Sequence, residues 1–513
     1  MLLSFILLIP TLNSIDGAKI LGVFPTPSIS HQLALRPLVQ ELARRGHEVT
    51  VITPNPAFPK GQAPKNLREI DVHNISYDRR EEYIEPFSTG DLKDVIRVMK
   101  AAVEFFKTII ELQLSVPEVQ ALINNKNETF DLILLEHCIR SGLIFSHLYK
   151  APVIYVSSFG SMMSTFDIVG APTHPILYGS MIRYKLVNLT IWDRLSELYI
   201  YYYYNDMYER HAAKENAMLR RMFGEDTPGV EELSKNVVMV FLNVHPIWED
   251  NRPVPPNVIF MGGVHQTPEK KLPQDLQKYL DSSKHGVIYF SMGTNVVPSA
   301  LPPERIQIFL KVFSKLPYDV LWKFNKDDLP GQPANVKLKK WLPQADLLRH
   351  PKIKVFITQG GLQSTDEAIT AGVPLLGIPM LADQWFNVER YVQLKIGVRL
   401  DFKDISEDSL KNAILSLIED KSYRENIEKL REVLADQPQR PVERAAWWTE
   451  HVLRHGAEHL KSPAANMSWT QYYEIQLVSL LLAGLVTAVS IVIFIVYILW
   501  KFINVTPVKV KKC

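Results

Sequence analysis

The densest group of chemically capable residues lies between Trp341 and Gln384. The segment reads WLPQADLLRHPKIKVFITQGGLQSTDEAITAGVPLLGIPMLADQ. Trp341 offers a flat aromatic face and Gln344 an amide, and together these groups suit a planar heterocyclic base. Gln359-Gly360-Gly361 follows a predicted strand and precedes a predicted helix. Glycines allow backbone N–H groups to approach an anion closely, and a helix N-terminus attracts negative charge.

Polar groups continue in order along the same segment. Ser364 adds a hydroxyl donor in the first turn of the predicted helix, and Glu367, one turn further, is placed to accept hydrogen bonds from a ribose. Asp383 and Gln384 follow the next predicted strand and suit sugar hydroxyls. A strand–Gly–Gly–helix turn alone fits an ordinary structural turn equally well. The prediction of a binding site in this segment therefore depends on the order of the groups, which suits a base, a phosphate, a ribose and a sugar in turn.

His31 is the candidate general base. It stands in the first turn of a helix predicted from about residue 31 to 45, after a strand at Lys19 to Phe24. The helix N-terminus favours the neutral imidazole, which accepts a proton. Glu136 follows a strand at Phe130 to Leu135 and so lies at the same sheet edge, where a carboxylate can orient His31 and stabilise its charged form. The alternative for His31 is a helix-capping role.

The alternation of strands and helices predicts two α/β lobes in tandem. Strand signals in the first half also fall at residues 48–53 and 152–157, and helical, aromatic-rich sequence fills about 160–225. After a Pro- and Gly-rich stretch, the second half repeats the pattern, with strand signals at 287–290, 319–324, 355–358 and 374–377. Such alternation indicates parallel sheets, which bind ligands at the carboxyl ends of their strands. The expected site is a cleft between the lobes.

The Trp341–Gln384 segment resembles the signature of the UDP-glycosyltransferase family. The match covers the Trp, the Gln, the double Gly, the Ser, the Glu and the terminal Asp-Gln, and the resemblance extends over nearly the whole chain. It is stronger to the insect and insect-virus branch, because Gln359 stands where vertebrate members carry His. Glu136 stands where the family usually carries Asp.

The resemblance implies two Rossmann-like lobes of the GT-B architecture. Residues 18–245 would form the acceptor-binding lobe, 246–285 a linker, and 286–461 the UDP-sugar-binding lobe. By resemblance, Trp341 stacks on uracil, Gln344 holds the base and ribose, and Glu367 binds the ribose. The diphosphate would be met by Gln359, Gly361 and Ser364, with Ser291, Gly293 and Thr294 across the cleft, and the sugar by Asp383 and Gln384.

The implied reaction is an inverting hexosyl transfer. The acceptor hydroxyl gives its proton to His31 while attacking the anomeric carbon, and UDP leaves in one step. The chain contains no Asp-X-Asp triplet, so we predict neither an essential metal nor a cofactor. The family implies glucose as the sugar, a small lipophilic acceptor such as a phenol, plant toxin or steroid, and a role in detoxification. The aromatic run at Tyr199 and Tyr201–Tyr204 would either line an apolar pocket or pack inside a helical subdomain.

Both ends of the chain predict a membrane topology. Residues 1–17 hold a short apolar run typical of a signal peptide. Residues 477–500 carry no charge and would form a helix of about 36 Å, long enough to span a bilayer. Lysines follow it, so residues 501–513 should be cytosolic, with 462–476 as a juxtamembrane segment. Lys509 and Lys511 resemble a dilysine retrieval signal, the alternative being an ordinary basic cluster. We therefore predict a single-pass type I protein of the endoplasmic reticulum membrane with a luminal body.

Other features constrain modifications and partners. Sequons for N-glycosylation begin at Asn74, Asn127, Asn188 and Asn466, all on the predicted luminal side. The two cysteines, Cys138 and Cys513, should lie on opposite sides of the membrane. A net charge of +2 without a basic stripe argues against a nucleic-acid partner, and a homo-oligomer stays open.

Rival interpretations keep the fold and change the activity. One is a carrier that binds a UDP-sugar or a lipophile without catalysis, and the other is a transferase acting on a lipid or protein glycan. A membrane adhesion protein has no support, because adhesion does not require the nucleotide-binding signature.

Overall fold

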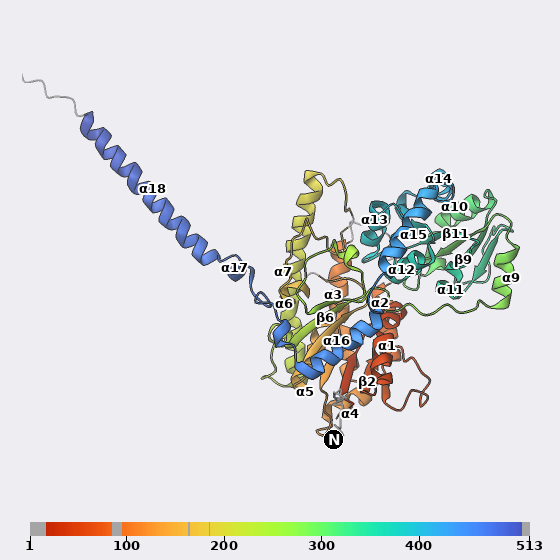
Figure 1. Ribbon diagram of the computed structural model, residues 1–513, viewed down its shortest axis with the longest axis horizontal. Helices are drawn as coiled ribbons and strands as arrows, with labels where there is room; N and C mark the ends of the chain where they lie inside the picture. Colours follow the sequence, from red (N-terminus) through yellow and green to blue (C-terminus); the bar gives the residue numbers. More distant parts are fainter. Residues whose placement is uncertain (1–16, 85–94, 163–164, 184, 505–513) are drawn as a thin grey trace, which may run out of the picture.

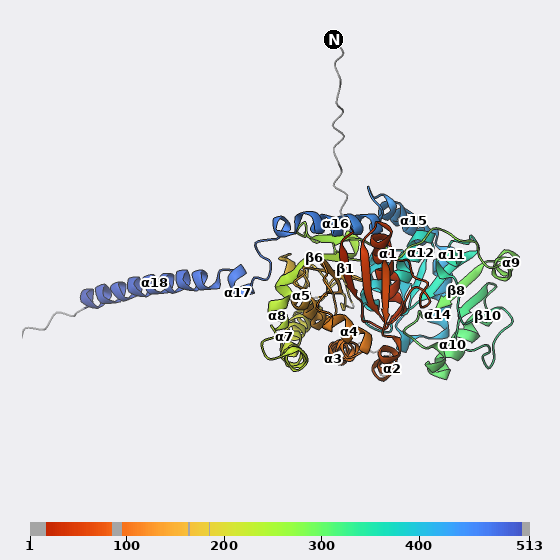
Figure 2. The same ribbon diagram turned by 90° about the horizontal axis from the view of Figure 1, so that it is seen from below.

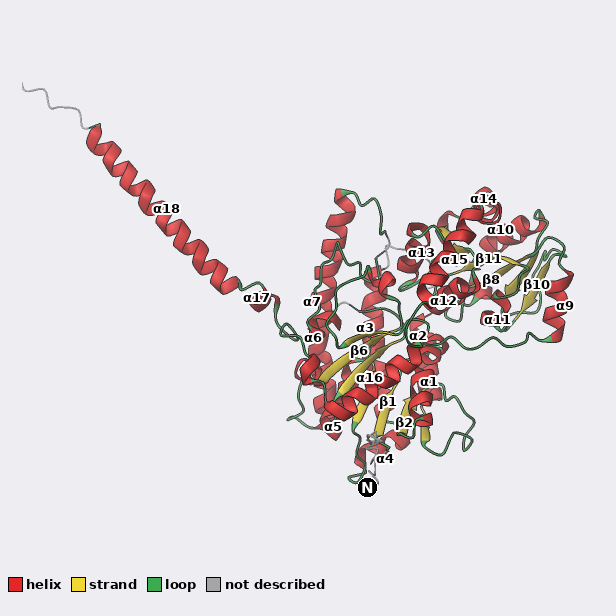
Figure 3. Ribbon diagram, viewed as in Figure 1, coloured by secondary structure: helices red, strands yellow, loops and turns green. Residues whose placement is uncertain are grey.

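The computed structural model describes residues 17–84, 95–162, 165–183 and 185–504. Two β-sheets, each flanked by helices, form the body, and one long helix stands apart from it (Figures 1 and 3). The predicted signal peptide, the dilysine pair and Cys513 lie outside the described residues, so these predictions stay untested.

The first sheet is entirely parallel, with the order β3-β2-β1-β4-β5-β6-β7. Strand order reverses at β1, which pairs with β2 on one side and β4 on the other. Ligands of doubly wound sheets bind at such a reversal. The strands are β1 (Lys19–Val23), β2 (Glu48–Thr53), β3 (Leu67–Asp71), β4 (Leu132–Glu136), β5 (Val153–Ser157), β6 (Val237–Leu242) and β7 (Val258–Phe260).

The second sheet is also parallel, with the order β10-β9-β8-β11-β12-β13, and its order reverses between β8 and β11. Its central strand β8 is fully buried, as expected for a sheet covered on both faces. They are β8 (Val287–Ser291), β9 (Asp319–Lys323), β10 (Val336–Lys339), β11 (Ile353–Thr358), β12 (Leu375–Gly377) and β13 (Gly397–Arg399).

Helices cover both sheets. Those of the first half are α1 (Ile29–Arg44), α2 (His73–Ile84), α3 (Val95–Leu114), α4 (Pro117–Asn124), α5 (Ile144–Tyr149), α6 (Thr165–Val169), α7 (Ile191–Phe223) and α8 (Val230–Leu233). Those of the second half are α9 (Gln274–Ser282), α10 (Pro303–Ser314), α11 (Gln344–Leu348), α12 (Leu362–Ala371), α13 (Gln384–Gln393), α14 (Glu407–Glu419), α15 (Lys421–Ala435) and α16 (Pro441–His455). The predicted tandem α/β fold is confirmed.

Two predicted domain boundaries are wrong. β7 lies within the predicted linker 246–285 but pairs with β6, so the first lobe continues past residue 245. α16 lies within the predicted second lobe but packs along α1 of the first lobe (Figures 1 and 2). The small side chains of Ala445 and Ala446 allow this close approach, and Glu450 pairs with Arg45 at 2.9 Å. The chain therefore crosses between the lobes twice.

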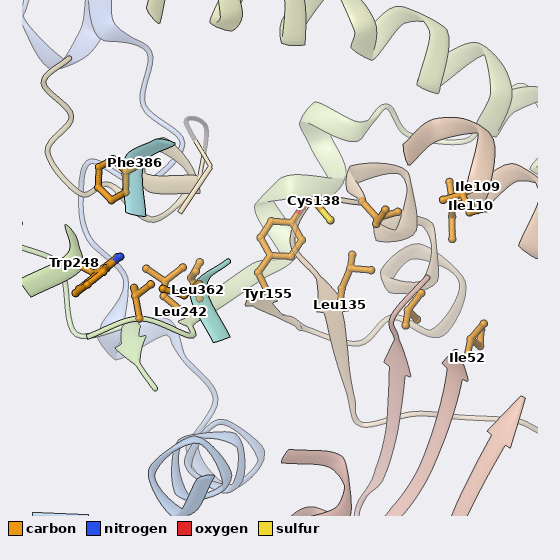
Figure 4. Packing of buried hydrophobic residues seen from close by; sticks show 14 of the residues in the cluster. Ile52, Ile109, Ile110, Leu135, Cys138, Tyr155, Leu242, Trp248, Leu362 and Phe386 are labelled. Carbon is orange, nitrogen blue, oxygen red and sulfur yellow. The ribbon is translucent and has the colours of Figure 1, made fainter. Parts of the chain in front are cut away.

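A shared hydrophobic core joins the lobes. Figure 4 follows it from Ile52 and Leu135 through Tyr155 and Leu242 to Leu362 on α12. Polar contacts reinforce this junction: the Trp248 indole N–H donates to the Asn387 Oδ1 at 2.9 Å, and Arg390 pairs with Asp250 at 2.6 Å. These contacts hold the two sheets so that the points at which their strand orders reverse lie opposite each other.

The helix that stands apart is α18 (Ile475–Ile503), preceded by the single turn α17 (Trp469–Tyr472). At 29 residues it is about 43 Å long, and none of its most apolar window is buried against the body. It is the one helix in the described part of the chain that is long and apolar enough to cross a membrane, and it contains the predicted span 477–500.

Candidate active site

His31 and Glu136 form a hydrogen-bonded pair at the point where the strand order of the first sheet reverses. His31 lies in the first turn of α1, which follows β1, and Glu136 ends the neighbouring strand β4. The His31 Nδ1 lies 2.5 Å from the Glu136 Oε1, and the Thr26 N–H donates to the Oε2 at 3.1 Å. Phe159 contacts the imidazole edge-on, with ring centroids 5.4 Å apart. The longer Glu side chain therefore reaches His31 in place of the usual Asp.

The electrostatics of the pair favour a charged carboxylate. Burial alone raises the pKa of Glu136, but the hydrogen bond and charge of His31, with the Thr26 N–H, hold that pKa below its ordinary value. A buried anion on Nδ1 directs Nε2 outward as the acceptor of a proton and stabilises the imidazolium that forms. His31 lines the main cavity, whereas Glu136 is 1 % exposed and lies behind it.

Glycine loops of the second lobe bring backbone amides to the same cavity. β11 ends at Thr358, Gln359-Gly360 follow, and Gly361 is the N-cap of α12 with no side-chain cap. The N–H groups of the first turn are thus open to an anion. The expectation that Ser291, Gly293 and Thr294 lie across the cleft from Gln359 is wrong, because they follow β8, which pairs with β11 in the same sheet. Gly293 stands beside Gln359 with a φ of +69°, and a Cβ there would overlap the Gln359 amide. The positive φ favours glycine, and any side chain at this position would require Gln359 to move.

The predicted base and ribose binders form one hydrogen-bond network. The Gln344 amide N–H₂ donates to the Ser364 hydroxyl at 2.9 Å and to the Glu367 carboxylate at 2.7 Å, and its Oε1 accepts from the Tyr289 hydroxyl at 2.9 Å. Burial raises the pKa of Glu367, against the hydrogen bond from Gln344. Trp341 stands beside this network with 64 % of its surface exposed, so its ring is open to stack on a base.

The predicted sugar binders face the cavity from the start of α13. The Asp383 carboxylate accepts from the Asn387 amide at 2.8 Å. Burial raises the pKa of Asp383, while the hydrogen bond from Asn387 and the charge of His31 oppose this rise. The side chains of Asp383 and His31 therefore interact electrostatically across the cleft. The Gln384 Oε1 accepts from the Met380 and Leu381 N–H groups, both at 2.9 Å, which leaves its N–H₂ group as the donor for a ligand.

Sequence reasoning missed Lys323, which ends β9 and lines the cavity. Its ammonium donates to the Gly293 carbonyl at 3.0 Å and lies 4.6 Å from the centre of the Trp341 ring. Burial lowers the pKa of Lys323. It supplies a cationic group near the glycine loops, where Gln359 has none. Its position at the carboxyl end of a strand was the signal that could have identified it.

The apolar wall of the cavity was also missed. The cavity has a volume of about 440 Å³, in the range of small-molecule sites. One face of α3 forms much of the wall, because its side chains recur at helical spacing toward the cleft; they are Val98, Met99, Ala102, Val103 and Phe106. Of the predicted tyrosine run, Tyr204 lines this cavity, while Tyr199 and Tyr202 are exposed.

All predicted donor-binding residues except Ser291 line the same cavity as His31. Ser291 is 1 % exposed at the end of β8, where its hydroxyl accepts from the Gly293 N–H at 3.3 Å, so it shapes the loop from behind. Thr294 lines the cavity beside Gly293. The structure therefore gathers His31 and the donor-type residues on opposite sides of a single cleft.

Comparison with known proteins agrees with this arrangement. The family described as "UDP-glucoronosyl and UDP-glucosyl transferase" matches residues 18–511. The chain is 35% identical over 480 residues to the ecdysteroid UDP-glucosyltransferase of Spodoptera littoralis nuclear polyhedrosis virus, which covers 90% of this chain and 93% of that protein. It is 33% identical over 487 residues to UDP-glucosyltransferase 2 of Dactylopius coccus, covering 92% and 91%.

A solved structure shares the fold. The UDP-glucose: anthocyanidin 3-O-glucosyltransferase in complex with UDP superposes with a TM-score of 0.59 over 86% of this chain and all of that chain, at 16% identity. The fold is thus the GT-B glycosyltransferase fold. The chain belongs to the UDP-glucuronosyl and UDP-glucosyl transferase family, and it transfers glucose from a UDP-sugar to an acceptor. The predicted likeness to insect and insect-virus members is confirmed.

Proposed function

We propose that the protein is an inverting, metal-independent glucosyltransferase that acts on a hydroxyl of a small lipophilic acceptor. The observation that carries the proposal is the His31–Glu136 pair, which opens on the same cavity as the glycine loops of the second lobe. The imidazole Nε2 faces the space in which an acceptor hydroxyl and the anomeric carbon of a donor would meet. This is the arrangement of an oriented general base.

In the proposed step the acceptor oxygen forms a bond to the anomeric carbon as the bond from that carbon to the UDP oxygen breaks. The hydroxyl proton passes to His31 Nε2, and Glu136 stabilises the resulting imidazolium. The α12 N-terminus and Lys323 meet the charge that develops on the departing diphosphate. Attack from the face opposite the leaving group converts an α-linked donor to a β-glucoside.

The acceptor class is inferred from the cavity wall. The α3 side chains, together with Phe159, Met162 and Tyr204, leave few polar partners for an acceptor beyond the reacting hydroxyl. Such a wall favours compact apolar molecules, including phenols and steroids. Several relatives are named for ecdysteroids, and a steroid-like acceptor belongs to this range. Detoxification of such compounds is the proposed role.

The proposal includes membrane anchoring by α18 and residence in the endoplasmic reticulum with the body in the lumen. The four predicted luminal sequons, at Asn74, Asn127, Asn188 and Asn466, all fall on exposed residues. Replacing Lys509 and Lys511 by Ser should release a tagged protein beyond the endoplasmic reticulum. Unchanged localisation would reject the retrieval signal.

The direct test uses membranes that carry the protein, with UDP-glucose or UDP-glucuronate, a panel of phenols and steroids, and EDTA. Glucoside formation with EDTA present supports the donor, the acceptor class and metal independence together. Tight UDP binding without product from any pair would favour the carrier interpretation. Loss of activity in EDTA that is restored by a divalent cation would refute the metal-independent step.

A further inference from the structure

A second, smaller cavity adjoins the main cavity in the first lobe. Met162 and Ser180 line both cavities, and on α7 Tyr204 lines the main cavity while Tyr201, one turn earlier, lines the small one. The small cavity has a volume of about 30 Å³, which is room for about two water molecules or one small polar group. It is too small for a separate substrate, so a ligand group that enters it belongs to a molecule bound in the main cavity.

Glu197 on α7 lines the small cavity with a carboxyl group that is buried and unpaired. Its residue is 6 % exposed, and among the described residues no hydrogen bond to the carboxyl is formed. The Arg183 Nε lies 3.9 Å from the Glu197 Oε2, which is beyond hydrogen-bond distance. Burial raises the pKa of Glu197 to about 7, against the charge of Arg183. A buried carboxyl without a hydrogen-bond partner is costly in free energy, so a ligand group beside it would stabilise the site.

Arg252 brings an unused hydrogen-bond donor to the same cavity. Its guanidinium carbon lies 4.0 Å from the centre of the Phe166 ring, and its Nη2 donates to the Tyr178 carbonyl at 3.4 Å. The Nε is buried and has no hydrogen-bond partner among the described residues. The neighbouring Glu249 carboxylate is 4.0 Å away and accepts from the Ser161 N–H at 2.8 Å. The residues around the small cavity therefore include both a donor and a carboxyl acceptor that the protein leaves unsatisfied.

This combination of groups selects the chemistry of the ligand. A hydroxyl accepts a hydrogen bond from a guanidinium and donates one to a carboxylate at the same time. A carboxylate in the cavity would be repelled by Glu197, and an ammonium group would be repelled by Arg252. An apolar group would leave both side chains unpaired. A neutral hydroxyl is therefore the group that suits this cavity.

We propose that the small cavity is a polar subsite that binds a second hydroxyl of the acceptor, remote from the hydroxyl that reacts at His31. The preferred acceptors are then rigid lipophilic diols, such as biphenyl diols and steroid diols. Met162 lines both cavities, and its flexible side chain allows a ligand to extend from one cavity into the other. This inference rests on the proposed function, because it narrows the acceptor class of the same site.

The subsite is tested by calorimetry on the full-length protein with UDP bound, so that binding is measured without turnover. Two matched pairs of ligands differ by one hydroxyl. The first pair is the para-linked biphenyl diol and the biphenyl with a single hydroxyl, and the second is oestradiol and its analogue without the hydroxyl on the five-membered ring. In at least one pair the diol should bind about tenfold more tightly than its partner, since it satisfies a charged group. Equal affinities within both pairs would mean that water alone fills the small cavity, and would overturn the proposal.

Glu197→Met assigns the effect to this carboxyl, beside the matched control Glu209→Met, which changes an exposed residue of α7 that lines neither cavity. The Glu197 variant should lose the preference for the diol and keep the wild-type affinity for the ligand with one hydroxyl, whereas the control should keep both. A diol preference that survives in Glu197→Met, or a loss of affinity for both members of a pair, would overturn the role of Glu197. Tighter binding of the diol without any glucoside from UDP-glucose would refute the proposed function and leave the subsite standing.

Discussion

Replacing Glu136 by Gln tests the pair on which catalysis depends. The substitution keeps the size of the side chain and removes its charge. At the observed 2.5 Å between His31 Nδ1 and Glu136 Oε1, an effective dielectric constant of about 20 gives a charge–charge attraction of roughly 7 kcal/mol for the imidazolium. The amide oxygen still accepts a hydrogen bond, so we expect about half of this to be lost. A barrier higher by about 3–4 kcal/mol lowers kcat by about 10²–10³-fold.

The assay is steady-state glucoside formation with UDP-glucose and a phenol, with kcat and KM measured separately. The KM for UDP-glucose should change little, because Glu136 lies behind His31 and does not line the cavity. Glu136→Asp is the matched control, since it keeps the charge and should retain most of kcat. A Gln variant within threefold of the wild-type kcat would refute the account of Glu136.

Other substitutions test the donor half of the site and its burial. Trp341→Ala should weaken UDP binding by roughly 10- to 100-fold through loss of a base stack, while Trp341→Phe keeps most of it; unchanged calorimetric affinity would rule out the uracil assignment. Gly293→Ala should lower UDP affinity at least tenfold because its Cβ meets Gln359, whereas Gly331→Ala, which shares the positive φ but meets only one atom at 3.5 Å, should not; equal affinities would contradict the close approach. Burial, and then the charge of Glu367, raises the pKa of Asp366 to about 8, and its Oδ2 has no hydrogen-bond partner. The unfolded chain releases this proton near pH 4, so the stability of the wild type falls between about pH 4 and 8. Asp366→Asn should therefore melt a few degrees above the wild type at pH 8 but not at pH 4. Melting temperatures of the two proteins that change in parallel with pH would disprove the assignment.

The elements of the fold were largely predictable because hydrophobic runs and turn residues are local signals. β2 begins and ends as expected, and the strand–Gly–Gly–helix turn at Gly361 lies where the pattern indicated. β7 has only three residues between prolines and glycines, too few to show a period. The apolar face of α16 indicated burial but not its partner, because a helix pattern carries no information on which lobe it packs against.

The site residues were predictable where a chemically reactive side chain follows the end of a strand. His31 and Glu136 sit at neighbouring strand ends, and parallel strands bring such residues to one sheet edge. Lys323 obeys the same rule but lies outside the signature segment, and one lysine among many carries no distinguishing spacing. The sequence of α3 has the pattern of an ordinary amphipathic helix. Only the tertiary arrangement shows that its apolar face is turned toward the cleft.

The most direct measurement compares the wild type with His31→Ala for both UDP binding and transfer from UDP-glucose, with the anomeric configuration of the product determined by NMR. The account predicts that the wild type forms a β-glucoside, and that the Ala variant binds UDP with unchanged affinity but transfers at least 10²-fold more slowly. An α-linked product, or a variant that transfers at the wild-type rate, would contradict it.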